Sequence, residues 1–167
     1  MEFYLVRHGE AVSQPVNGQR PLTPAGRRDV EHVGQAAAER GIQAGKIFHS
    51  GLLRAQQTAE ILSDSLGLVQ GTGELIGLKP DDDPVIARTE LESSTVSLML
   101  VGHLPHMRRL ASFLVAGDAD RDLVEFAPAT MVGLSYEDHR WKILWKLTTT
   151  TAQSKLTGER GWSKRNR

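Results

Sequence analysis

The sequence has 167 residues, of which 40% are hydrophobic and 24% charged, a composition typical of one soluble globular domain. Twenty basic residues balance twenty acidic ones, which argues against a chain-wide surface for nucleic acid or anionic membranes. Cysteine is absent, and this excludes disulfides, thiolate zinc sites and a cysteine nucleophile. The apolar run at residues 1–7 is too short for a signal peptide or a membrane span, so we expect a cytoplasmic protein.

The basic residues are concentrated towards the C-terminal end of the chain. Residues 155–167 hold five basic side chains and one acidic one, a local charge of +4 in a chain that is neutral as a whole. After Thr148 the sequence shows no apolar periodicity. We therefore expect one domain over residues 1–150 and a basic tail over 151–167, with Trp162 as the residue through which the tail would dock.

Apolar periodicity and turn residues predict strands and helices that alternate over the first 116 residues. Thr23 followed by Pro24 is typical of a helix start, and Ser50 and Gly67 are expected to cap and to end the next helix. Strands are predicted at 1–6, 46–49 and 96–101, with weak pieces at 68–69 and 74–75, and helices at 24–40, 51–66, 84–93 and 105–116.

The last part of the predicted domain is a hairpin. Apolar strands at 131–136 and 141–147 flank a polar loop at 137–140, and the second strand alternates apolar and polar residues as a half-buried edge strand does. Together with the alternating elements before it, this hairpin predicts an α/β fold. We expect a three-layer α/β/α sandwich whose sheet is mainly parallel with an antiparallel edge hairpin.

Three loops that carry reactive side chains each follow a predicted strand. Arg7-His8-Gly9 follows the first strand, residues 50–58 (SGLLRAQQT) follow the second, and residues 102–105 (GHLP) follow the central apolar strand. Because the carboxyl ends of parallel strands lie at the same edge of a sheet, we expect His8, Arg54 and His103 to meet in one crevice. His49 ends the second strand beside these loops. It could contact a ligand or have a structural role, and the sequence does not distinguish the two.

The residue types in these loops suit phosphoryl transfer. A neutral imidazole such as that of His8 is a competent phosphoryl acceptor, and Gly9 allows a close backbone approach to phosphate. The guanidinium groups of Arg7 and Arg54 match phosphate oxygens two at a time. The six histidines show no metal-ligand spacing, so we predict neither a metal nor another cofactor.

Four motifs in this order resemble those of the histidine phosphatase superfamily, also called the phosphoglycerate mutase-like family. They are LVRHGEA (Leu5–Ala11), RPLTPAG (Arg20–Gly26), SGLLRAQQTAE (Ser50–Glu60) and VGHLPHM (Val101–Met107). The resemblance spans about residues 1–147 and is strongest to the SixA-type phosphohistidine phosphatases. It implies the phosphoglycerate mutase-like fold and a phosphatase that forms a phosphohistidine intermediate.

The resemblance also implies a role for individual residues. His8 resembles the nucleophile that becomes phosphorylated, Arg7 and Arg54 resemble the arginines that hold the phosphoryl oxygens, and His103 resembles the second histidine of the pocket. Arg20 matches a further phosphate-binding arginine of the SixA-type branch.

Ser50 also matches the family, but the residue after it does not. Ser50 stands where the family often has a serine on the phosphate side. The next residue, Gly51, replaces the proline common in the family, which affects the stiffness of the loop more than its chemistry.

An acidic residue that many family members use to protonate an ester leaving group has no clear counterpart here. In residues 73–84 (GELIGLKPDDDP), Glu74 lies earlier than the expected position, and Gly77 occupies it. An alkoxide leaves poorly without a proton, whereas a protonated imidazole leaves as a neutral ring. The absence favours a phosphoramidate substrate, although residues 81–83 could supply an acid if they are more than a solvated turn.

Three hypotheses about function follow. The favoured one is a phosphatase for phosphohistidine on a signalling protein, such as a histidine phosphotransfer domain. The first alternative is a phosphomonoesterase for a small molecule, either a sugar phosphate or a nucleotide. The second is a non-catalytic phosphate-binding module that docks through its basic tail. None of the three involves nucleic acid or a membrane.

Overall fold

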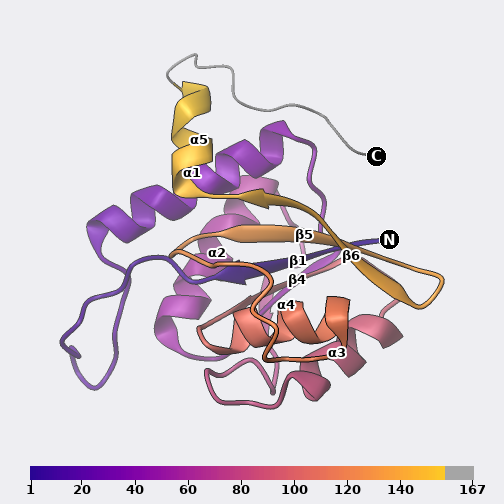
Figure 1. Cartoon of the computed structure of the whole chain (residues 1–167). Coiled ribbons are helices and arrows are strands. Elements are labelled where there is room, and N and C mark those ends of the chain that lie inside the picture. The colour runs from indigo at the N-terminus through magenta and orange to yellow at the C-terminus, as the bar shows by residue number, and fades with distance from the viewer. Residues whose placement is uncertain (157–167) are drawn as a thin grey trace.

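The computed structural model describes residues 1–156 as one mixed sheet covered by helices on both faces (Figure 1). The strands are β1 (Glu2–Arg7), β2 (Lys46–His49), β3 (Thr72–Glu74), β4 (Leu98–Gly102), β5 (Met131–Glu137) and β6 (Arg140–Leu147). The helices are α1 (Pro24–Glu39), α2 (Leu53–Leu66), α3 (Pro84–Ser93), α4 (His106–Ala116) and α5 (Thr149–Leu156). None of these helices is both long and apolar enough to cross a membrane.

The sheet has the strand order β3-β2-β4-β1-β5-β6. Neighbouring strands from β3 to β1 are parallel, and β5 and β6 are antiparallel at the other edge. This arrangement confirms the predicted three-layer α/β/α class with an antiparallel edge hairpin. It also places β2, β4 and β1 side by side, so their carboxyl ends, which carry the three reactive loops, are adjacent.

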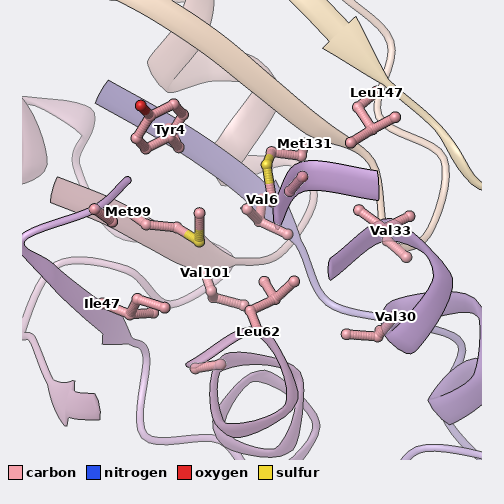
Figure 2. Close-up of a cluster of buried hydrophobic side chains, with 14 of the residues drawn as sticks. Tyr4, Val6, Val30, Val33, Ile47, Leu62, Met99, Val101, Met131 and Leu147 are labelled. Atoms are coloured by element: carbon pink, nitrogen blue, oxygen red, sulfur yellow. The ribbon is translucent and has the colours of Figure 1, made fainter. Parts of the chain in front are cut away.

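The hydrophobic core lies in two layers, one on each face of the sheet. β4 is buried along its whole length: Met99 and Val101 face α1, α2 and α5, whereas Leu98 and Leu100 face α3 and α4. Figure 2 shows the first layer, where side chains of β1, β2 and β4 meet those of α1 and α2. A continuous apolar run is therefore explained by a strand that is covered on both faces.

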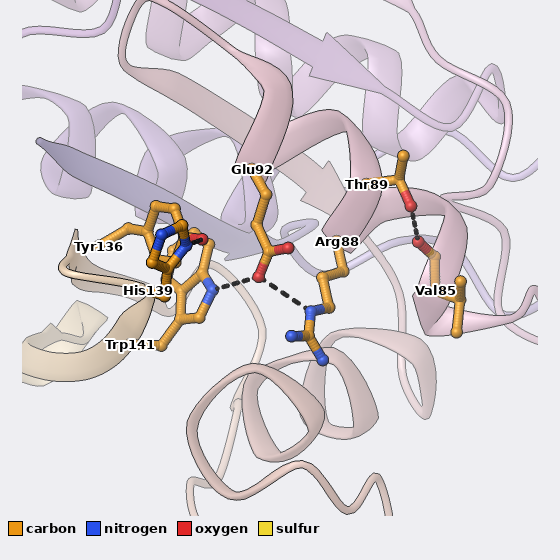
Figure 3. A network of polar contacts seen from close by, with 7 residues as sticks. All are labelled: Val85, Arg88, Thr89, Glu92, Tyr136, His139 and Trp141. Carbon is orange, nitrogen blue, oxygen red and sulfur yellow. Dashed lines mark hydrogen bonds and ion pairs between the residues drawn. The ribbon is translucent and has the colours of Figure 1, made fainter.

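A small polar network joins α3 to the edge hairpin (Figure 3). The indole Nε1 of Trp141 donates to Glu92 Oε1 at 3.0 Å, and Arg88 forms an ion pair with the same oxygen at 2.9 Å. The Trp141 ring also packs against Phe3, with a centroid distance of 5.3 Å. These contacts tie α3 to the end of the sheet opposite the reactive loops.

The largest differences from the sequence prediction lie at the start of α2 and at β3. The prediction that Ser50 caps the second helix is wrong, because α2 begins at Leu53 and Leu52 is its N-cap without a side-chain bond. The Ser50 hydroxyl bonds elsewhere, as described below. The weak strand pieces at 68–69 and 74–75 are replaced by one strand at Thr72–Glu74, which pairs with β2.

The segment predicted as a tail begins with a helix, α5. Helix α5 crosses the predicted boundary at residue 150, and its Ala152 is buried in the core layer that contains α1. A single buried alanine among threonines gives no apolar periodicity, which explains why the sequence pattern missed this helix. The predicted docking of Trp162 lies outside the described residues.

The first turn of α1 packs closely against the loop that follows β1. The Thr23 hydroxyl accepts the Gly26 N–H at 2.9 Å, as its predicted capping role requires, and the Thr23 N–H donates to the Glu10 carbonyl at 3.0 Å. A Cβ on Gly9 would lie 2.7 Å from Val30 Cγ2, and one on Gly26 would overlap the Glu10 carbonyl oxygen. Glycine at both positions is therefore required for this close contact.

We predict that Gly26→Ala destabilises the protein although alanine is the better helix former. Helix propensity favours the substitution by about 1 kcal/mol, but overlap with the Glu10 carbonyl, a backbone group, costs about 3 kcal/mol, so we expect a net loss of about 2 kcal/mol. Urea unfolding measures the difference, with exposed Arg28→Ala on the same helix as a control expected to stay within about 0.5 kcal/mol of the wild type. An alanine variant as stable as the wild type contradicts the close packing.

Candidate active site

The three reactive loops meet at one edge of the sheet. The rings of His8, which follows β1, and His103, which follows β4, lie 5.0 Å apart between centroids. Ser50, which follows β2, places its Oγ 2.6 Å from His103 Nε2. The structure thus brings together side chains from three neighbouring strands, at the place where the topology of a parallel sheet puts a ligand site.

The backbone of His8 is fixed on both sides. Its N–H donates to the Gly102 carbonyl at 3.0 Å, and its carbonyl accepts the Ala129 N–H at 3.1 Å. The ring Nδ1 lies 2.7 Å from the Gly9 carbonyl oxygen. A carbonyl only accepts, so Nδ1 carries the proton and Nε2 of the neutral ring has a free lone pair. Nε2 is therefore the ring nitrogen of His8 whose lone pair is available to a ligand.

The tautomer of His103 follows from its contact with Ser50. The Ser50 Oγ already accepts the Leu52 N–H at 3.3 Å, and the serine side chain is only 2% exposed. When the Ser50 hydroxyl donates to His103 Nε2, that hydroxyl both accepts and donates, and the proton of the neutral histidine stands on Nδ1. His103 Nδ1 is buried without a partner within residues 1–156, so it offers an N–H to an anion beside His8.

Two arginines add further donors around the histidines. Arg7 is anchored by its Nη1, which donates to the Phe126 carbonyl at 2.8 Å, and Arg54 lies in the first turn of α2. In the described part of the chain, the Nε atoms of both are buried without a hydrogen-bond partner. The positive charges of both lower the pKa of His8, which shows that they act on the same space.

The other predicted site residues, Arg20, Gly9 and Ser50, form hydrogen bonds with other groups of the protein. Arg20 donates its Nε to the Val12 carbonyl at 2.9 Å, and its charge acts on both His8 and Arg54. The Gly9 N–H donates to Thr58 Oγ1 at 3.1 Å, so this amide is committed to α2. Ser50 reaches the pocket through His103. A direct phosphate contact for Arg20, Gly9 and Ser50 stays a prediction.

Burial keeps the two pocket histidines neutral. Desolvation, with smaller contributions from the neighbouring cations, lowers the pKa of His8 to about 4. Desolvation and the charges of His8 and Arg54 lower the pKa of His103 to about 3. At neutral pH both rings are therefore uncharged, and the positive charge of the site comes from the arginines. A neutral nucleophile among fixed donors is suited to accept a phosphoryl group.

The sequence motifs did not reveal three parts of the site. Thr58 accepts from Gly9 and donates to the Arg54 carbonyl at 2.8 Å, which joins two of the reactive loops. The Phe126 carbonyl comes from an irregular segment 119 residues after Arg7. Thr130, whose carbonyl accepts the Arg7 N–H, is fully buried. Only Thr58 had a signal, since it lies in the SGLLRAQQT motif one helical turn after Arg54.

The described residues contain no group of three or more potential metal-ligating side chains.

We predict that ¹⁵N NMR of the imidazoles in phosphate-free buffer shows His8 as the Nδ1–H tautomer, neutral from pH 8 to below 5. Since its pKa is lowered to about 4, the ring takes up a proton only as the pH falls through that value. The His8→Ala variant assigns the resonance. An Nε2–H tautomer, or a titration near the ordinary value of about 6.5, contradicts the assignment of the free lone pair to Nε2.

Comparisons with known proteins identify the family of the chain. The family model described as the histidine phosphatase superfamily (branch 1) matches residues 3–75, which include His8 and Arg54. An uncharacterized protein of Picosynechococcus sp. is 33% identical over 141 residues, covering 80% of this chain and 84% of that protein. The Yersinia enterocolitica protein named "Probable phosphoglycerate mutase GpmB" is 42% identical over 73 residues, but the match covers only 33% of its length.

The fold is shared with solved structures as well. The protein histidine phosphatase SixA complexed with tungstate superposes with a TM-score of 0.82, covering 90% of this chain and 98% of SixA at 23% identity. At that identity the superposition shows the fold, and the family assignment comes from the family model that matches residues 3–75. The chain belongs to the histidine phosphatase superfamily.

Proposed function

We propose that this phosphatase removes the phosphoryl group from phosphohistidine on a protein, through a phosphohistidine intermediate on its own His8. The observation that carries the proposal is the bond from His8 Nδ1 to the Gly9 carbonyl, which leaves Nε2 unprotonated beside buried, unpartnered donors of Arg7, Arg54 and His103. Buried donors without partners are unfavourable in the free protein, and oxygens of a phosphoryl group can satisfy them.

In the first step the lone pair of His8 Nε2 forms a bond to phosphorus while the P–N bond of the substrate breaks. The substrate ring, protonated on its other nitrogen, leaves as a neutral imidazole. In the second step water attacks phosphorus, the bond to Nε2 breaks and its electron pair returns to His8, and the phosphate product keeps both the hydroxyl and the remaining proton of that water, leaving as dihydrogen phosphate. Because Nδ1 keeps its proton on the Gly9 carbonyl, His8 also leaves as a neutral ring. Neither step requires a carboxylic acid.

The carboxylates near the site support this proposal. Asp82 Oδ2 accepts the Lys79 N–H at 2.9 Å, and Asp83 Oδ1 accepts the Val85 N–H at 3.0 Å as the cap of α3. Both are thus used to form the turn and the helix start. Glu74 lies against Gly51 and interacts with His49 rather than with His8.

Space for a protein substrate exists beside the pocket. A groove of about 410 Å³ is lined by Leu104, which follows His103 in the sequence, and by Phe126, whose carbonyl holds Arg7, but by none of the side chains of the site itself. Arg108 and Glu125 also line it, so its surface is partly charged. Such a groove can hold residues that flank a phosphohistidine on a protein surface.

The alternative of a small-molecule phosphomonoesterase is favoured by one observation, the match to a protein named as a phosphoglycerate mutase over the residues that include His8 and Arg54. It requires an acid for the leaving alkoxide, and Asp81 to Asp83 or Glu74 would have to provide it.

The test is a single-turnover reaction with a phosphorylated histidine phosphotransfer domain. We expect the wild type to remove its phosphoryl group with transient acid-labile phosphate on the enzyme, and His8→Ala to form none. His139→Asn, which changes an exposed histidine outside the pocket, is expected to behave as the wild type. Phosphate esters are expected to have a kcat/KM at least about 100-fold lower, since a missing general acid is worth 10²–10⁴ in rate.

Two results would overturn the proposal in different ways. Phosphohistidine left intact while esters turn over, with loss of that activity in Glu74→Gln or in Asp81→Asn to Asp83→Asn, indicates the small-molecule phosphomonoesterase. No phosphorylation of His8 by either class of donor indicates a non-catalytic phosphate-binding module.

A further inference from the structure

We propose that His49 is a positioning residue for the same site, which orients the donor of His103 through the turn at Ser50 and Gly51 and releases it when His49 takes up a proton. The inference rests on the proposed function for its rate measurements, but its binding and NMR measurements do not need a phosphohistidine substrate.

His49 supports the turn directly. It is the last residue of β2, is 7% exposed, and pairs in register with Glu74 of β3 and Val101 of β4. The Gly51 N–H donates to His49 Nδ1 at 3.0 Å. Since an N–H donates here, Nδ1 is the unprotonated nitrogen, and the neutral ring carries its proton on Nε2.

The backbone conformation of the turn explains why this bond matters. Gly51 has a φ of +90°, in the region that side chains disfavour. A Cβ at Gly51 would lie 2.5 Å from Glu74 Oε1, so the Glu74 carboxylate occupies the space beside the bare glycine. The turn is therefore held by the His49 ring on one side and is packed by Glu74 on the other.

The conformation of this turn orients the Ser50 hydroxyl towards His103. Ser50 Oγ accepts the Leu52 N–H at 3.3 Å and lies 2.6 Å from His103 Nε2. A continuous series of hydrogen bonds and one turn thus runs from His49 through Gly51 and Ser50 to His103. Loss of the first bond frees the turn, and the His103 ring then loses the partner that keeps its proton on Nδ1, towards the anion.

Protonation of His49 breaks this series, because it places an N–H opposite the N–H of Gly51. The charged groups that face His49 are Glu74 from β3 and Glu60 from α2, and both favour the protonated form. Burial opposes them more strongly and lowers the pKa of His49 below its ordinary value. The turn is therefore intact at neutral pH, and it is released as the pH falls into the acidic range.

The test compares His49→Asn with His49→Gln. The Asn Oδ1 stands near the place of Nδ1 and can accept the Gly51 N–H without titrating, whereas the Gln Oε1 lies one bond further out. We expect His49→Asn to bind tungstate within about threefold of the wild type at pH 7.5, and His49→Gln to bind at least about 10-fold more weakly, because misplaced donors are costly in such sites. His49→Leu is a second variant without an acceptor, expected to match His49→Gln.

Two further readouts separate positioning from a general structural role. In ¹⁵N NMR, His103 is expected to remain the Nδ1–H tautomer in His49→Asn and to lose this preference in His49→Gln. For the rate of His8 phosphorylation, we expect the wild type to be fast at neutral pH and to lose rate on acidification. His49→Gln is expected to be slow at both pH values, and His49→Asn to keep the neutral-pH rate of the wild type at both.

Equal behaviour of the Asn and Gln variants in tungstate binding and in the His103 spectrum overturns the inference, whatever the substrate proves to be. If instead these two measurements follow the expected pattern and no donor phosphorylates His8, the inference about His49 stands and the proposed function falls. Thermal unfolding of each variant shows that the comparison is made between folded proteins.

Discussion

The chemistry of this site depends on the hydrogen bond between His8 Nδ1 and the carbonyl of Gly9. In the mechanism we propose, this bond leaves Nε2 as the nucleophilic nitrogen and retains on Nδ1 the proton that lets the ring leave neutral after transfer. The carbonyl is in place because Gly9 packs against Val30 and Gly26 at the start of α1 and donates its N–H to Thr58. The first turn of α1 and Thr58 of α2 therefore both position the carbonyl that binds His8 Nδ1.

A second constraint is that the donors around His8 are buried before any ligand arrives. Each buried donor without a partner destabilises the fold by about 1–3 kcal/mol, and the pKa values of His8 and His103 are lowered far below 6.5 by the same burial. The lowered pKa values of these histidines reduce the free energy of unfolding in acid. Below about pH 6.5 the histidines of the unfolded chain bind protons, whereas the buried rings of the folded protein stay neutral. A bound oxyanion accepts hydrogen bonds from these donors and so offsets part of this cost. Ligand binding is therefore expected to raise the free energy of unfolding.

Much of the fold and the meeting of the loops could be predicted because the signals are local or topological. The uninterrupted apolar run of β4 indicated a central strand, and parallel strands bring His8, Arg54 and His103 to one edge. Contacts between distant segments were not predictable. Ser50 has the residue type and position of a helix cap, but its hydroxyl binds His103, 53 residues later. No pattern indicated that Gly51 leaves the space that the Glu74 carboxylate occupies.

The most direct measurement is a crystal structure of this protein with tungstate, an oxyanion that mimics a transferring phosphoryl group. We expect tungsten in line with His8 Nε2, with oxygens about 3 Å from the Nε atoms of Arg7 and Arg54 and from His103 Nδ1. His8 Nδ1 remains on the Gly9 carbonyl in that complex. An anion bound away from Nε2, or a His8 ring turned so that Nδ1 faces the anion, would contradict the proposed role of His8 as nucleophile.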